Sequence, residues 1–153
     1  MRDSLLLVLA VALLSGGCSG PTPPPFRPVV DNKLLMQAVV DPNADLLWDA
    51  VKTIVSTEGT EEIRPKTEAE WTAVRNAAVA LTESGNLMMM VPRAKDGGEW
   101  MTRSQAMIDS GTAAIRAAEA KDAARLFTVG GDIYDACSNC HRLYLDAIVN
   151  ANK

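Results

Sequence analysis

Residues 31–153 read as a succession of helices, and this pattern constrains the fold more than any other feature of the chain. Alanine, leucine, methionine and glutamate dominate, and apolar residues recur at three- and four-residue spacing. The strict period-two alternation that would indicate a half-buried strand is missing. Aromatic residues make up only 5% of the chain, which is low for an all-β domain. We therefore expect an all-α domain without strands.

The first helical unit, predicted over residues 31–56, contains an irregularity. Apolar residues such as Leu35 and Val51 share one side of it, whereas Pro42 interrupts the backbone hydrogen-bond ladder. Asp41 followed by Pro42 is typical of an N-cap and a first helical residue. The unit is therefore either one kinked helix or two helical pieces joined at Asp41.

Three further helical units follow, separated by short connections that are polar or rich in helix breakers. They cover residues 67–90, 99–120 and 123–150. Thr67, with Glu70 three residues later, has the spacing of a capping box at the start of the second unit. Four helical units with mostly short connections favour an antiparallel four-helix bundle.

The N-terminal residues have the composition of an export signal. Arg2 is followed by an apolar run over 5–14 and by small residues at 15–17, a run too short to span a membrane. Cys18 comes next, and the stretch resembles a bacterial lipoprotein signal, in which cleavage leaves a lipidated cysteine at the new N-terminus. The alternative is ordinary cleavage nearby, with Cys18 lost or left as a free thiol.

Proline is dense in the segment after Cys18, and such a segment is extended and solvated. We therefore expect a signal peptide over 1–17, a lipidated cysteine with a proline-rich tether over 18–30, and one folded domain over 31–153. The formal net charge of -4 argues against general nucleic-acid binding, which requires a basic face.

The segment CSNCH concentrates two of the three cysteines and the only histidine of the chain. On a helix Cys137, Cys140 and His141 stand at i, i+3 and i+4, so their side chains point to one face. Covalent haem attachment needs this arrangement, because two thiols must reach two vinyl groups while the imidazole binds the iron. The C-x-x-C-H pattern is the attachment signature of c-type haem. The segment therefore predicts one covalent haem c, with His141 as the proximal axial ligand.

The two cysteines also allow three alternatives to haem attachment. Cys137 and Cys140 could form a disulfide after export, although this leaves the adjacent His141 unexplained. A thioredoxin-like redox pair would need a strand and a βαβ context, which the sequence does not show. A closed zinc site would need four ligands, and no second histidine exists.

The chain resembles the class II c-type cytochromes, the cytochrome c-prime group, from about Asp31 to its end. The carriers of the resemblance are CSNCH near the C-terminus and the following RLYL, which gives a His-x-x-Tyr continuation. The resemblance implies a four-helix bundle whose C-terminal helix holds the covalent haem. Globular class I cytochromes carry the motif near the N-terminus and fit poorly.

Members of that family differ at the sixth position of the iron. Some leave it open and bind small gases, and others use a methionine of the first helix and carry electrons. The resemblance implies Met36 as the distal axial ligand, with packing in the core as the alternative. If Met36 points away, Leu35 is the expected distal blocker. Met101, Met107 and the methionines of 88–90 are expected to pack in the bundle or line the pocket.

Three further residues are candidates for the haem pocket. Arg93 could grip a haem propionate with a two-pronged hydrogen bond, or it could be a solvated surface charge. Tyr134 lies two helical turns before His141 on a similar face. Trp100 could supply a large apolar surface against the haem or pack in the core.

These observations predict a monohaem electron carrier of the periplasm of a Gram-negative bacterium, anchored by an N-terminal lipid, and not an enzyme. Its expected partners are redox proteins and the membrane, and the family resemblance also implies dimerisation; nucleic acid is not expected. Two alternatives stay open. One is an open-site cytochrome that binds NO or CO, and the other is a helical lipoprotein without haem, in which Cys137 and Cys140 form a disulfide.

Overall fold

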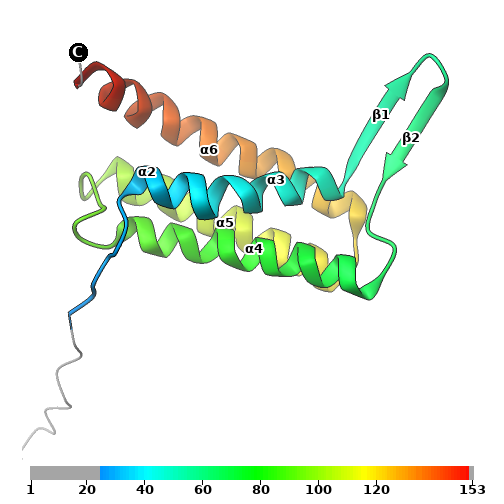
Figure 1. The fold of residues 1–153 in the computed structure, drawn as a ribbon, viewed down its shortest axis with the longest axis horizontal. Coiled ribbons are helices and arrows are strands. Elements are labelled where there is room, and N and C mark those ends of the chain that lie inside the picture. Colours follow the sequence, from blue (N-terminus) through cyan, green and yellow to red (C-terminus); the bar gives the residue numbers. More distant parts are fainter. Residues whose placement is uncertain (1–24, 152–153) are drawn as a thin grey trace, which may run out of the picture.

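The computed structural model describes residues 25–151, with side chains through residue 145. The predicted signal peptide over 1–17, the predicted lipidation site Cys18 and the first part of the predicted tether lie outside these residues. The described chain is mainly helical, as expected, and four helical units run side by side in alternating directions (Figure 1). In the part of the chain from residue 25 to 151, no helix is both long and apolar enough to cross a membrane.

The first unit is one helix with a π-helical turn in its middle. It consists of α2 (Asn32–Leu35), the π turn η1 (Met36–Val40) and α3 (Asp41–Ala50). Asp41 has α-helical dihedral angles of -57° and -50°, and its N–H donates to the carbonyl of Met36, five residues back. Asp41 is therefore not an N-cap, and of the two alternatives the continuous helix is observed, with a π turn at its irregular point.

A β-hairpin follows α3, where the sequence predicted helix up to residue 56 and no strand at all. Strand β1 (Lys52–Ser56) pairs with β2 (Gly59–Ile63) in antiparallel register, and the hairpin projects away from the bundle (Figure 1). The prediction is wrong here because three consecutive β-branched residues, Thr53 to Val55, favour extended backbone. Gly59 takes a φ of 140°, which glycine adopts at low cost, and completes the turn.

The other three helices begin and end close to where the sequence predicts. They are α4 (Glu68–Met89), α5 (Glu99–Glu119) and α6 (Ala123–Ala151). The predicted capping box is present, with Thr67 Oγ1 accepting from the N–H of Glu70 and the Glu70 carboxylate accepting from the N–H of Thr67. At the start of α6, the Asp122 carboxylate accepts from the N–H of Arg125 at 2.8 Å. These local hydrogen bonds determine where the helices begin.

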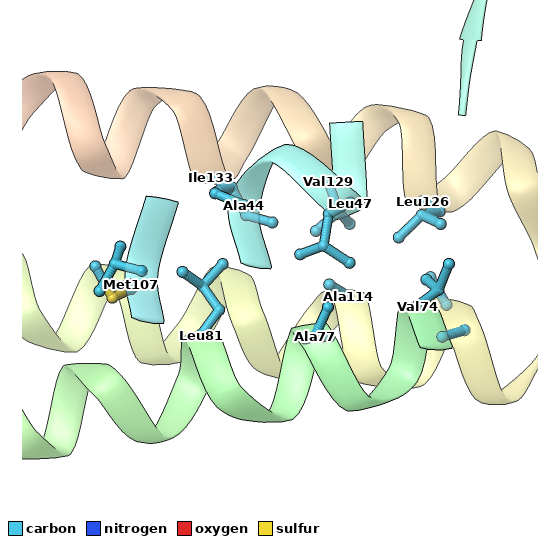
Figure 2. Close-up of a cluster of buried hydrophobic side chains, with 14 of the residues drawn as sticks. Ala44, Leu47, Val74, Ala77, Leu81, Met107, Ala114, Leu126, Val129 and Ile133 are labelled. Carbon is cyan, nitrogen blue, oxygen red and sulfur yellow. The ribbon is translucent and has the colours of Figure 1, made fainter. Parts of the chain in front are cut away.

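The core lies along the axis of the bundle and receives side chains from all four units. Leu47 of α3, Leu81 of α4, Ala114 of α5 and Ile133 of α6 are almost completely buried and point toward one another (Figure 2). Burying each large aliphatic side chain contributes roughly 1.5–3 kcal/mol to the stability of the fold. Toward its C-terminal end, α6 diverges from the first unit (Figure 1).

Glycines allow α4 and α5 to approach each other closely. A Cβ atom added to Gly85 would lie 2.5 Å from Ile108 Cγ1 and 2.9 Å from the backbone oxygen of Ser104. Gly111 of α5 is similarly placed against Thr82 of α4. Gly131 of α6, in contrast, faces open space.

We predict opposite effects of alanine at two of these helical glycines. Gly85→Ala should lower the free energy of unfolding by about 1–3 kcal/mol, because the methyl group meets backbone that cannot move freely. Gly131→Ala should raise it by roughly 0.5–1 kcal/mol, because alanine favours the helix and meets nothing. Urea denaturation followed by circular dichroism measures both. Equal stability of the two variants would contradict the close approach of α4 and α5.

Candidate functional site

A cavity of about 200 Å³ lies beside the CSNCH segment, between the four helical units. Its lining includes Cys137, Cys140 and His141 of α6 together with Met36 of the first unit. These residues are far apart in the sequence, and the fold brings them to one space. The remaining lining residues are Val40, Asp41, Trp48, Met88, Arg103, Met107, Tyr134, Ala136 and Ser138.

The helix α6 presents the three residues of the motif on one face. It runs without interruption through CSNCH, so the predicted helical spacing of Cys137, Cys140 and His141 is confirmed. Both cysteines are half-buried and His141 is exposed. Among the described side chains of α6, Ile133 is the last that is completely buried; it lies one turn before Cys137, and the cavity begins beyond it. The motif therefore stands where the core ends and the cavity opens.

The environment of the two thiols opposes ionisation. Both cysteines are free in the structure. Burial, together with the neighbouring Cys140 and Asp41, raises the pKa of Cys137 to about 11. Burial also raises the pKa of Cys140, although the positive charge of Arg103 opposes this shift. A nucleophilic redox cysteine needs a lowered pKa, so the arrangement does not favour thioredoxin-like chemistry.

The π turn places Met36 and Leu35 in different surroundings. Leu35 is 2% exposed and packs in the core, whereas Met36 is partly buried and lines the cavity. Leu35 is not part of the lining, so it does not take the place of a distal blocker. Met88 and Met107 also line the cavity but are buried in the core. Met101 is outside the lining.

Arg93 has a different role from the one that the sequence suggested. Its side chain is buried and donates from Nε to the carbonyl of Val30 at 3.0 Å and from Nη1 to the carbonyl of Leu87 at 3.3 Å. The side chain of Asn32 donates in turn to the carbonyl of Arg93. Through these two hydrogen bonds, Arg93 holds the segment before α2 against the end of α4. Arg93 is not in the cavity lining, and its Nε and Nη1 are engaged by backbone carbonyls.

Of the two aromatic candidates, Tyr134 lines the cavity and Trp100 does not. Tyr134 lines the cavity and packs edge-on against Trp48, with ring centroids 6.4 Å apart. Trp100 is buried in the core outside the lining, and its indole N–H donates to the carbonyl of Met88 at 2.8 Å. This hydrogen bond connects Trp100 to Met88, which does line the cavity.

Arg103 is the lining residue that the sequence analysis missed. Its Nη2 pairs with the Glu99 carboxylate at 2.8 Å, while its Nε is buried without a hydrogen-bond partner. A signal existed in the sequence, since Arg103 lies three residues after Trp100 and four before Met107. It therefore shares the apolar side of α5, where a charged residue needs a reason.

A hydrogen bond holds α6 just beyond His141. The Tyr144 hydroxyl donates to Asp96 Oδ2, and Asp96 Oδ1 accepts from the N–H groups of Gly98 and Trp100 at the start of α5. The Tyr144 ring also packs edge-on against Trp100, with centroids 4.9 Å apart. The bond from Tyr144, followed by those from the two N–H groups, lowers the pKa of Asp96. The same bond raises the pKa of Tyr144 to about 12.

We predict that Tyr144→Phe raises the pKa of Asp96 toward its ordinary value, because the largest cause of the shift is removed. A carboxyl group with a lowered pKa in the folded state stabilises the fold above its ordinary pKa, and the contribution disappears as the pH falls through the folded pKa. The variant should therefore be less stable than wild type at pH 7, and this difference should shrink in acid. NMR titration of Asp96 and urea unfolding between pH 7 and pH 3 measure the two effects. An unchanged pKa of Asp96 would contradict the assignment.

In the described part of the chain, no group of three or more His, Cys, Asp or Glu side chains is arranged to hold a metal ion. Comparison with known proteins does not add to these observations. No protein-family model matches the chain, and no curated protein or solved structure matches it at a significant level.

Proposed function

We propose that the chain is a monohaem c-type cytochrome that carries single electrons. The observation that supports this most directly is the shared cavity, whose lining joins the C-x-x-C-H face of α6 to Met36 of the first unit. In this proposal Cys137 and Cys140 hold one haem by thioether bonds and His141 binds its iron. Bound there, the haem supplies a redox centre that cycles between two oxidation states.

The chemistry of the lining suits a porphyrin. Val40, Met88 and Met107 give the cavity an apolar wall, and small Ala136 leaves room one residue before Cys137. Burial raises the pKa of both cysteines, so their surroundings oppose thiolates, which is compatible with groups that end as uncharged thioethers.

Arg103 is the residue that we assign to a haem carboxylate, in place of Arg93. Arg103 lines the cavity, and its buried Nε has no hydrogen-bond partner, so we propose that a propionate of the bound haem satisfies this donor. The ion pair with Glu99 holds the guanidinium from its other end. The carboxylate would gain a charge-assisted bond at little cost in side-chain ordering.

Met36 is the residue that we assign to the distal side of the iron. It reaches the cavity from the helical unit opposite α6, whereas the other methionines of the lining are more deeply buried in the core. A neutral thioether ligand favours reduced iron relative to a second imidazole, and it suits electron transfer more than gas binding. Export, the lipid anchor at Cys18, a periplasmic location and redox-protein partners remain part of the proposal and depend on the N-terminal sequence.

The first test is whether a c-type maturation system attaches haem. The wild type should carry haem that survives denaturing electrophoresis, and its oxidised spectrum should be low-spin with the weak near-infrared band of a sulfur–iron bond. The double variant Cys137→Ser with Cys140→Ser should carry none. Met36→Ala should be high-spin and bind carbon monoxide, while the matched control Met101→Ala, outside the lining, should resemble wild type.

Two results would count against this proposal. Wild-type protein without covalent haem would remove the proposed function and favour a helical lipoprotein with a Cys137–Cys140 disulfide. A high-spin wild type that is indifferent to Met36→Ala would retain the haem but favour a gas-binding protein with an open iron site.

The reduction potential tests the role of Arg103 separately. Arg103→Leu should lower the potential by roughly tens of millivolts, because a positive charge near the haem favours the reduced state; a tenfold change in the equilibrium is about 59 mV for one electron. Arg103→Lys should lower it less. The control Arg93→Leu should reduce stability and leave the potential close to that of wild type. Equal potentials of wild type and Arg103→Leu, measured by redox titration, would contradict the assignment.

A further inference from the structure

We propose that Pro42 is a positioning residue for Met36, and that it acts through the π turn that directly precedes it. This inference rests on the proposed function, in which Met36 binds the iron. The inference explains why the Met36 side chain lines the cavity: the register of the first helical unit places it there.

The π turn lies where proline disturbs an α-helix. Pro42 has no N–H to donate, and in regular α geometry its ring would collide with the carbonyl four residues earlier, at Ala38. In the structure the turn is wider, and the N–H of Asp41 reaches the carbonyl of Met36. The side chain of Asn43 donates to the carbonyl of Val39 at 2.7 Å, so this carbonyl has a partner next to the proline. The helix thus passes the proline without ending.

A π turn contains one residue more than the α turn that it replaces. Relative to α3, the residues before the turn are therefore rotated by about 100°, the angle of one residue in an α-helix. In the observed register Leu35 fills a core position and Met36 lines the cavity. In an uninterrupted α-helix continued backward from α3, Met36 would take the core position of Leu35, and Gln37 would take the cavity position of Met36.

The two registers differ in chemistry and not only in packing. Gln37 is exposed in the structure, and its amide would replace the thioether in the cavity lining. The sulfur would then lie in the apolar core, out of reach of the cavity. In this proposal the residue at position 42 therefore decides which of two neighbouring side chains, Met36 or Gln37, lines the cavity that His141 also lines.

The experiment compares the optical spectra of the haem-loaded full chain in the wild type and in three variants that carry Pro42→Ala, alone or with a second change. Pro42→Ala restores the missing donor and removes the steric conflict, so the unit should close into an α-helix. We expect most of the sulfur–iron band to disappear and carbon monoxide to bind. Adding Gln37→Met to Pro42→Ala should restore the band, because position 37 now faces the cavity. Adding a deletion of Ala38, an exposed residue of the π turn, should restore it through Met36, because the extra residue is gone.

Asp45→Ala is the matched control, since Asp45 is exposed on α3 and its replacement leaves the π turn in place. Its spectrum should be that of wild type. A sulfur–iron band of full strength in Pro42→Ala would overturn the inference. Loss of the band in Pro42→Ala that neither second change restores would also overturn it, because general damage to the helix would then be the cause.

Failure of the proposed function would be visible before any change at Pro42. It would appear as a wild type without covalent haem, or as a wild-type spectrum that Met36→Ala does not alter. In either case the inference about Pro42 also fails, because it assumes that Met36 binds the iron. A wild type that depends on Met36 and a Pro42→Ala variant that still shows the band would remove the inference alone.

Discussion

The packing of α6 against α5 is the constraint on which the rest of the site depends. On one side of the motif, Leu126, Val129 and Ile133 anchor α6 in the core (Figure 2). On the other side, the Tyr144 hydroxyl donates a hydrogen bond to Asp96, which lies just before α5. The stretch between these anchors carries the two cysteines and His141. Because both ends are held, the face that carries the motif is held as well, and the cavity lies beside it.

The cavity combines apolar walls with few polar groups, and these groups are unequally satisfied. Asp41 lies at the surface and adds to the cost of ionising Cys137, while Arg103 carries a buried donor without a partner. A protein interior seldom leaves such a donor unpaired without a reason. An anionic group of a bound cofactor would provide one, and this links the electrostatics of the wall to the proposed haem. Arg93 lies outside the cavity lining, and its Nε and Nη1 donate to backbone carbonyls.

Features governed by neighbouring residues could be predicted well, and those governed by competition between local preferences could not. The capping box of Thr67 and Glu70 placed the start of α4, because the interaction lies within four residues. The hairpin was missed because the apolar spacing that includes Val51 suggested a longer helix. The β-branched residues that follow it favour a strand. At Pro42 the local signal indicated an irregularity, but the choice between a new helix and a π turn depends on how Leu35 and Ala44 pack against the other units.

The sequence by itself determined that Cys137, Cys140 and His141 share one face, because that follows from the repeat of a single helix. It also indicated a mainly helical domain, because apolar spacing and capping residues are local. Only the tertiary structure decided that Met36, Met88 and Met107 share a cavity with that face while Met101 does not, and that Arg103 rather than Arg93 lies in its wall. These choices depend on the crossing and register of separate helices. Contacts between residues distant in the chain set both, and no spacing within one helix encodes them.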